Sequence, residues 1–357
     1  MADKLYHSTR QLVKILRNKN VSISKGAQGS RVVKILTHEN YYNVVNGYKD
    51  LFIDHTVTSR EQYRAGTTFE EIYSLFCFDR NIRNLFLKYL LKIENSFKTV
   101  LSAVFSKKYG CDNYLIFDNF NCEPNTSRKN LLRIANKNNL NLNIRHEYDE
   151  VLKISQTEVM SNLAGLFGKI QNEISHQLSK NNACIKHYMT KYGYIPLWVL
   201  VNILTFGKIC DFYLNMKDND KISIAGEFGI QYRELHKAVE MLALARNYCA
   251  HGNRFFDIKF KKSLSFNQYN KISRKMNEFN NLGLPVSNGN YLKGSKDLFA
   301  IVILFTQFLG KSEIKEFIKG LENEIESLSK NLITISVNDV LNNMGFPSNW
   351  KLVSKLC

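Results

Sequence analysis

Arg246, Asn247 and His251 are the side chains of this sequence best suited to chemistry on a phosphodiester. They lie in the stretch RNYCAHGNR, directly after the apolar stretch MLALA. An imidazole titrates near neutral pH and can take the proton of a ribose 2′-hydroxyl. A guanidinium binds phosphate through paired N–H groups and stabilises charge that develops on its oxygens. With Asn247 as the orienting group, these three side chains could together promote attack of the 2′-oxygen on the adjacent phosphorus. Because no cluster of carboxylates lies near this stretch, we expect no metal ion and no cofactor.

The spacing of this motif leaves two interpretations open. Arg246 and His251 are five residues apart, so in an unbroken helix they lie about 140° apart around the axis. Both can face one groove only if the helix loosens near Cys249 or if the groove lies at a junction between helices. The structural alternative is that arginine and histidine are common near a helix C-terminus, where the helix dipole favours cations.

Two long helices are predicted to position these side chains. The motif helix runs from about Tyr232 to Ala250, after a turn marked by Gly226 and Gly229. An earlier helix begins at Thr68 and ends at Gly110, with a break expected near Asp79, because apolar residues recur along it at helical spacing. Glu94 falls on or beside the apolar stripe of that helix, an unusual place for a carboxylate.

The rest of the chain also reads as helices. Four prolines and the scarcity of turn signals disfavour a many-stranded protein, so the predicted fold class is all-α. Residues 111–145 are rich in Asn and basic residues and are predicted to be an insertion or mobile arm. We further expect a short β-like stretch at 332–337, a loop at 282–290, and helices at 5–16, 24–36 (capped by Ser24), 147–177, 197–216, 266–280, 295–309, 313–329 and 337–344.

The charge of the chain points to a polyanion. Forty-nine Lys and Arg face 32 Asp and Glu, for a net charge of +17, and residues 1–36 hold eight basic residues against one acid. Binding nucleic acid would relieve this self-repulsion and release counterions; the alternative is a merely solubilising surface. The side chains predicted to bind RNA are Lys14, Arg17, Lys19, Arg31, Lys34, Arg128, Lys129, Arg133, Arg254, Lys259, Lys261 and Lys262.

Cysteine usage and hydropathy bear on the compartment. The seven cysteines are scattered singly, no CxxC pair occurs, and the N-terminus is polar. We therefore expect reduced thiols in a cytoplasmic protein without a membrane span, because the longest apolar stretches are too short to cross a bilayer. The chain also lacks the GxGxxG, GxxxxGK[ST], HExxH and GxSxG motifs, so it offers no support for dinucleotide, nucleotide-hydrolysing, zinc-protease or serine-hydrolase activity.

Four stretches of the chain, in order, resemble the Abi-like family of bacterial abortive-infection proteins (the AbiD/AbiF group). They are QLVKILRNKNVSIS with HENYYNVVNGY, then FEEIYSLFCFDRNIRNLFLKYLLKIENSFKTVLSAVFSKKYG, then PLWV with FGK, and finally LARNYCAHGNRFFD. Together they cover most of residues 5–260. The resemblance implies an N-terminal basic helical segment (1–60), a helical core (61–260, with the basic insertion near 111–145) and a C-terminal helical extension (261–357).

That family is similar to the HEPN superfamily of helical RNases and RNA-binding modules, whose motif is R-x4–6-H. The resemblance implies a HEPN-like helical bundle with additional N- and C-terminal helices, Arg246 and His251 as the motif pair, and Asn247 as its polar neighbour. HEPN active sites are usually composite, so one motif per chain implies a homodimer. Glu94 is a candidate to contact and support Arg246 or His251 without touching the RNA itself. The alternative is that Glu94 forms a salt bridge to Lys92 or Lys98 on a solvated face.

Three functions follow from these expectations. The leading one is a metal-independent endoribonuclease of an abortive-infection system, toxin-like and controlled by a cognate noncoding RNA. The second is a catalytically inert RNA-binding protein that forms a regulatory ribonucleoprotein in phage defence. The third is an inhibitor that binds a phage protein, which predicts no copurifying RNA.

Overall fold

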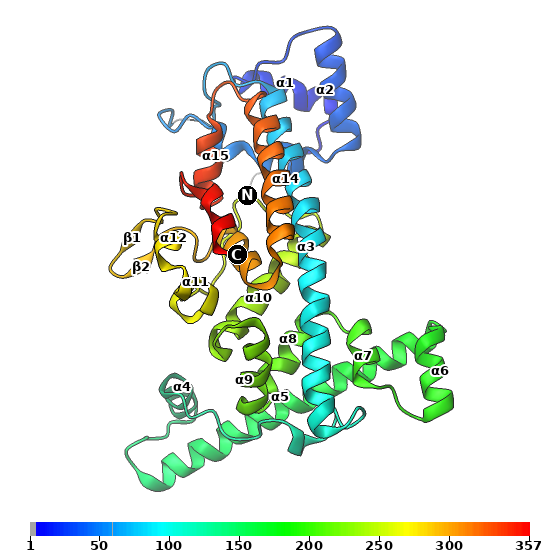
Figure 1. Ribbon diagram of the computed structural model, residues 1–357. Helices are drawn as coiled ribbons and strands as arrows, with labels where there is room; N and C mark the ends of the chain where they lie inside the picture. The colour runs from blue at the N-terminus through cyan, green and yellow to red at the C-terminus, as the bar shows by residue number, and fades with distance from the viewer. Residues whose placement is uncertain (1–4, 59) are drawn as a thin grey trace. The chain divides into compact units, whose positions relative to one another are not determined.

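The computed structural model describes residues 5–58 and 60–357, so Asp3 and Lys4, which entered the charge count above, lie outside the described residues. The fold is all-α, as predicted (Figure 1). The only paired strands among the described residues form one small hairpin, β1 (Val286–Ser287) with β2 (Asn290–Tyr291), which overlaps the predicted 282–290 loop and extends one residue beyond it. None of the helices in these ranges combines the length and apolar character that crossing a bilayer needs.

The helices have the following bounds in chain order. They are α1 (Thr9–Asn18), α2 (Ala27–His38), α3 (Phe69–Tyr109), α4 (Arg128–Asn138), α5 (Arg145–Ser179), α6 (Ala183–Tyr192), α7 (Leu197–Ile203), α8 (Phe206–Asn215), α9 (Asp218–Phe228), α10 (Tyr232–Ala250), α11 (Asn270–Arg274), α12 (Met276–Asn280), α13 (Leu298–Phe308), α14 (Lys311–Ser329) and α15 (Val337–Asn343). Short π or 3₁₀ turns lie at Tyr42–Asn46, Lys49–Phe52, Phe117–Asn119, Phe266–Gln268 and Trp350–Leu356.

The chain divides into two compact units, and the division falls within α3 and α10. Unit 1 comprises residues 1–90, 245–267 and 271–357, and unit 2 comprises residues 91–244 and 268–270. The motif residues 246–251 therefore belong to unit 1. The segments 1–60, 61–260 and 261–357 expected from the sequence stay a prediction.

Helix α3 begins and ends at local signals that the sequence carries. Thr68 Oγ1 accepts from the Glu71 amide at 3.2 Å, and the Glu71 carboxylate accepts from the Thr68 amide at 3.2 Å, which is a capping box. At the other end Gly110 takes a φ of +89° and its amide donates to Ser106 O. The predicted break near Asp79 was wrong, because the Asp79 carboxylate bonds to Arg83 one turn along and leaves the backbone helical.

The fully buried Glu71 also holds a distant segment of unit 1. Its Oε1 accepts from the amides of Ile333 and Thr334, each at 2.6 Å. The β-like stretch predicted at 332–337 was wrong for this reason: its amides bind a carboxylate on α3 instead of a neighbouring strand. The helix predicted after it is present as α15.

The core of unit 1 is aromatic. Phe86 on α3 packs against Phe255, Phe305 and Phe317, with ring centroids 5.0–5.5 Å apart. Helix α14 runs alongside the first part of α3 (Figure 1), where Leu85 packs against Gly320. The predicted helices at 295–309 and 313–329 are thus confirmed as α13 and α14.

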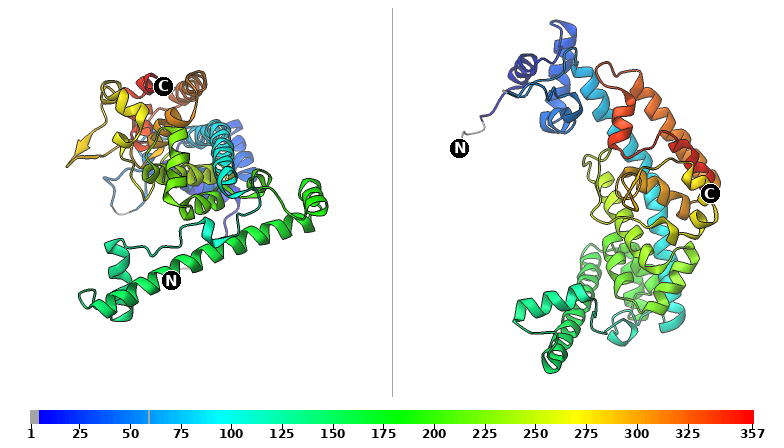
Figure 2. Two further views of the ribbon diagram at one scale, coloured as in Figure 1. Left: turned by 60° about the horizontal axis from the view of Figure 1, so that its bottom comes forward. Right: turned by 90° about the vertical axis from the view of Figure 1, so that its left-hand side faces the viewer.

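In unit 2, the segment 111–145, predicted to be an insertion or mobile arm, contains a packed helix. Helix α4 folds back on the long helix α5 (Figure 2), and Leu131, Ile134, Ala135 and Val151 form a buried cluster between them. This part of the segment is therefore not a free arm, because the apolar residues of α4 recur at helical spacing between its basic ones; that the segment is an insertion stays a prediction. Helix α6 is a further element that the sequence interpretation did not include.

Several predicted helix bounds were also wrong. The helix predicted at 197–216 is two helices, because Thr205 caps α8 by accepting from the Lys208 amide. The helix predicted at 266–280 is interrupted at Lys275, and Gly226 lies inside α9, so only Gly229 turns the chain there. At the N-terminus Ser8 caps α1, and the N-cap of α2 is Gly26 instead of Ser24.

Candidate active site

The motif helix α10 ends where the sequence predicts. Its last residue is Ala250, and Gly252 adopts a φ of +69°. The Asn253 amide donates to Tyr248 O at 3.1 Å, which is the long hydrogen bond of a Schellman C-cap. His251 is therefore the C-cap residue, and its exposed side chain stands at the end of the helix.

Asn247 contacts both other members of the motif. Its side-chain oxygen accepts from Nη1 of Arg246 at 3.3 Å, and its backbone carbonyl accepts from the His251 amide at 3.0 Å. Arg246 and Asn247 are half-buried, whereas His251 is exposed. The helix does not loosen at Cys249, so Arg246 and His251 remain about 140° apart around its axis.

Cys249, although it lies within the motif, takes no part in the group formed by Arg246, Asn247 and His251. Its side chain is buried, and burial raises the pKa of the thiol well above its usual range. The thiol therefore stays protonated at neutral pH, and a protonated thiol is a poor nucleophile.

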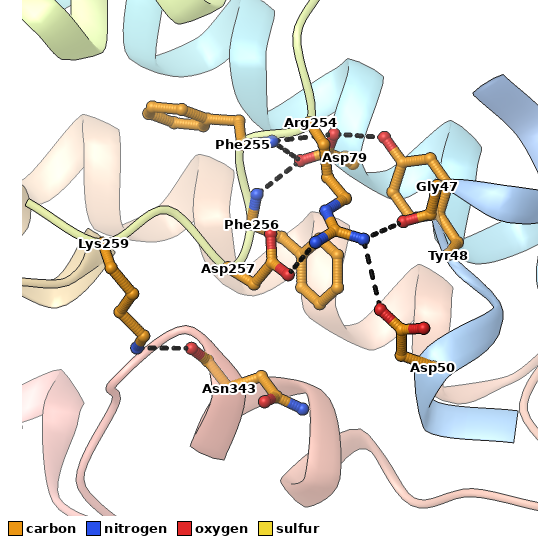
Figure 3. A network of polar contacts seen from close by, with 10 residues as sticks. All are labelled: Gly47, Tyr48, Asp50, Asp79, Arg254, Phe255, Phe256, Asp257, Lys259 and Asn343. Carbon is orange, nitrogen blue, oxygen red and sulfur yellow. Dashed lines mark hydrogen bonds and ion pairs between the residues drawn. The ribbon is translucent and has the colours of Figure 1, made fainter. Parts of the chain in front are cut away.

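The chain directly after His251 is tied to α3 by the buried carboxylate of Asp79 (Figure 3). Asp79 accepts from the amides of Phe255 at 3.2 Å and Phe256 at 2.7 Å, and also from the Tyr48 hydroxyl and the Arg83 guanidinium. Arg83 in turn donates to Asn253 O at 3.2 Å. We refer to Asp79, Arg83, Tyr48 and the backbone of 253–256 as the Asp79 clasp.

Burial away from water shifts the pKa values of the side chains in the Asp79 clasp. Burial raises the pKa of Asp79 to about 6, while Arg83, Tyr48 and the two amides act to lower it. Burial and the adjacent carboxylate raise the pKa of the Tyr48 hydroxyl, which therefore remains a hydrogen-bond donor. A carboxylate that is fully bonded in a dry site makes a rigid anchor, because every lost contact leaves a costly unpaired group.

A second set of contacts surrounds Arg254 in Figure 3. Its guanidinium donates to Gly47 O and lies 2.9 Å from Asp257 and 3.5 Å from Asp50. Arg254, predicted from its charge to bind RNA, carries contacts that hold the segment after the motif. Its RNA-binding role stays a prediction.

Comparison with known families identifies the chain. A model of the Abi-like protein family matches residues 34–257, which is more than half of the sequence. The chain belongs to the Abi-like protein family. Comparisons with curated proteins and with solved structures gave no match.

The family match includes both the motif and the Asp79 clasp. It begins inside α2 and ends at Asp257, so α1 and the residues after 257 lie outside it. This protein is therefore an abortive-infection protein in the general sense of that family, and its motif lies within the part of the chain that the family defines.

Glu94 lies on the part of α3 that belongs to unit 2. Its carboxylate forms an ion pair with Lys98 at 2.8 Å, and both side chains are buried. The salt bridge to Lys98 that the sequence suggested as an alternative is present, although on a buried face instead of a solvated one. The role of Glu94 behind the motif stays a prediction.

The structure divides the basic residues predicted to bind RNA. Four are engaged by carboxylates of the chain: Lys19 with Glu61, Arg31 with Glu70, Arg133 with Glu158, and Arg254 as above. Lys259 donates to Asn343 O at 3.1 Å (Figure 3). Arg17 is half-buried, and the remaining six are exposed: Lys14, Lys34, Arg128, Lys129, Lys261 and Lys262.

Sequence reasoning missed the Asp79 clasp. A signal was present, because Asp79 and Arg83 form an i, i+4 pair of opposite charge on the apolar stripe of α3. No pattern among neighbouring residues predicts that Asp79 and Arg83 bond to the backbone of residues 253–256. Among the described residues, no group of three or more His, Cys, Asp or Glu side chains is placed to hold a metal ion.

Proposed function

We propose that this Abi-like protein is an endoribonuclease of phage defence, with Arg246, Asn247 and His251 as its catalytic residues. The observation that carries the proposal is the position of His251: an exposed imidazole at the C-cap of α10, just after Arg246, whose guanidinium donates to the Asn247 side chain. The R-x4-H spacing resembles that of HEPN RNases, and the chain's net charge of +17 suits an RNA substrate.

The proposed cleavage of RNA needs no oxidant or reductant. A histidine base takes the proton of the ribose 2′-hydroxyl, and the 2′-oxygen forms a bond to the adjacent phosphorus. The bond from phosphorus to the 5′-oxygen breaks, and that oxygen receives a proton from an acid. The products are a 2′,3′-cyclic phosphate and a 5′-hydroxyl. Arg246 stabilises charge on the non-bridging oxygens, and Asn247 orients Arg246.

A second copy of the chain completes this site. One motif offers a single imidazole, whereas the reaction needs both a base and an acid. Because α10 keeps its helical twist, Arg246 and His251 do not project from the same face of one helix. Two motifs facing each other across a two-fold axis would place the histidine of one copy near the arginine of the other.

The test uses short single-stranded RNA in buffer that contains EDTA. We expect the wild-type protein to produce fragments that end in 2′,3′-cyclic phosphate. His251→Ala should abolish cleavage and keep RNA affinity, and Arg246→Lys should lower the rate by about 10²–10³ because an ammonium lacks the paired geometry of a guanidinium. The matched control is His38→Ala, because His38 is also an exposed histidine at the end of a helix.

The rival function is an inert RNA-binding protein, favoured by the exposed basic residues that need no catalysis to hold RNA. It predicts RNA in the purified sample, no cleavage by the wild type, and phage protection that survives His251→Ala. A cognate noncoding RNA as regulator is compatible with both functions. RNase treatment of the purified protein, followed by sequencing of what is released, would identify that RNA.

A further inference from the structure

A basic pocket of about 490 Å³ lies between α1 and α2 in unit 1. Four of its lining side chains are cations: Arg10, Lys14, Arg17 and Lys25. None of the described residues that line it is acidic. We call this hollow the α1–α2 pocket; it differs from scattered surface charge because four cations line the same space.

The structure holds one of these cations in place. Nε of Arg17 donates to Ile23 O at 3.0 Å, and Nη2 donates to Ser24 O at 3.2 Å. Carbonyl groups orient a guanidinium but do not cancel its charge, and further N–H donors of the fork remain. Gly29 makes room for it, because a Cβ there would lie 3.3 Å from Nη2 of Arg17 and 3.0 Å from Ser24 O.

The backbone adds to the positive potential. The N-cap of α2 is Gly26, which lines the pocket and makes no side-chain cap hydrogen bond. The first amides of a helix favour an anion when no side chain caps them. Ser30, in the first turn of α2, adds a hydroxyl to the lining.

Two neighbouring cations outside the pocket are paired with carboxylates. Lys19 lies 2.7 Å from Glu61, and Arg31 lies 3.3 Å from Glu70. The described residues that line the pocket include no carboxylate, so the charge of its four cations is available to a bound anion.

We propose that the α1–α2 pocket binds the phosphorylated 5′ end of an RNA strand. An internal phosphodiester carries one negative charge, whereas a terminal triphosphate carries several, which suits a hollow lined by four cations. The pocket lies before residue 34, outside the family-matched region, and so apart from the motif that the match includes. The proposal rests on RNA as the partner, but not on cleavage.

The experiment measures RNA binding by the full-length His251→Ala protein, which leaves the RNA intact. The probes are one short single-stranded sequence with a 5′-triphosphate and the same sequence with a 5′-hydroxyl. We expect the 5′-triphosphate RNA to bind at least about tenfold more tightly at fixed salt. Replacing both Lys14 and Lys25 by alanine should remove that preference, and because both side chains are exposed the fold should be retained.

The matched control is Lys34→Ala, which removes an exposed cation of α2 outside the pocket. It should weaken binding of both RNAs equally and leave the preference intact. Equal affinity of the two RNAs for the parent protein, or a preference that survives the double substitution, would overturn the proposal.

Two competitors distinguish binding of an RNA 5′ end from binding of a free phosphate compound. Inorganic tripolyphosphate and a free nucleoside triphosphate should displace the 5′-triphosphate RNA only at much higher concentrations than unlabelled RNA of the same kind. If the free nucleotide competes as well as the RNA, the pocket is a nucleotide site and the RNA-end proposal fails. The cleavage test under "Proposed function" is independent, since it depends on His251 and not on the end of the strand.

Discussion

The carboxylate of Asp79 accepts a hydrogen bond of 2.7 Å from the amide of Phe256, and it is fully buried. This bond joins α3 to the chain that leaves the end of α10. Asp79 therefore anchors the chain a few residues after His251, although it is not one of the proposed catalytic residues. The Asp79 clasp can be tested apart from catalysis, through folding.

We expect Asp79→Ala to lower the free energy of unfolding by about 3–5 kcal/mol, because it leaves the Arg83 cation buried without its carboxylate. Denaturant unfolding followed by circular dichroism measures the loss. The control is Asp50→Ala: the Asp50 carboxylate faces Arg254 at 3.5 Å but is 70% exposed, so its loss should cost about 1 kcal/mol or less. Similar losses for the two variants would show that the clasp is not an anchor.

The pH dependence of stability should carry the signature of Asp79. Burial raises its pKa from 3.8 to about 6, so below pH 3.8 its contribution to stability is fully present, and it is lost as pH rises through 6. The stability of wild type relative to Asp79→Asn, which cannot titrate, should therefore fall between about pH 4 and pH 6. Urea unfolding of both proteins at several pH values measures the difference; a rise over the same window would contradict the assignment.

Gly252→Ala tests the turn that presents His251. An alanine there has open space around its Cβ but must hold a φ of +69°, so we expect a loss of about 1 kcal/mol and a larger fall in cleavage than in RNA affinity. The control is Gly165→Ala in the middle of α5, which also meets open space but has helical geometry. That substitution should raise stability by up to about 1 kcal/mol. Melting temperatures and single-turnover cleavage distinguish the two.

Arg128 and Lys129 test the basic start of α4. Both are exposed, so if each contacts one RNA phosphate, replacing both by alanine should reduce the slope of log affinity against log salt by about 1.4. Arg133→Ala is the control, because Arg133 already binds Glu158 and Asn130. Binding measured across a series of salt concentrations gives the slopes, and an unchanged slope in the double variant would remove these residues from the interface.

Features set by nearby residues could be predicted from the sequence. Thr68 and Glu71 form the cap that begins α3, Gly110 ends it, and Ala250 with Gly252 ends the motif helix as expected. Each depends on residues within one turn, where sequence patterns are informative. Local patterns gave a wrong prediction at residues 197–216. The helical spacing of apolar residues continues across Thr205, so the sequence predicts one helix where Thr205 caps the start of a second one.

Long-range polar contacts could not be predicted. Asp79 reaches Phe256 across 177 positions, and Glu71 reaches Thr334 across 263. A single sequence shows that such carboxylates lie among apolar residues, but not which amides meet them. The basic N-terminus illustrates the same limit, because its charge was visible while the pairing of Lys19 and Arg31 with acids was not.

The bonds from Glu71 to Ile333 and Thr334 have a consequence for how the protein is made. A ribosome releases the start of α3 long before it has added residues 333 and 334. Until those residues emerge, the Glu71 carboxylate lacks the two amides that donate to it in the folded protein. A polypeptide truncated before residue 333 would therefore leave this carboxylate without those partners, so the native environment of the start of α3 forms only after most of the chain has been synthesised.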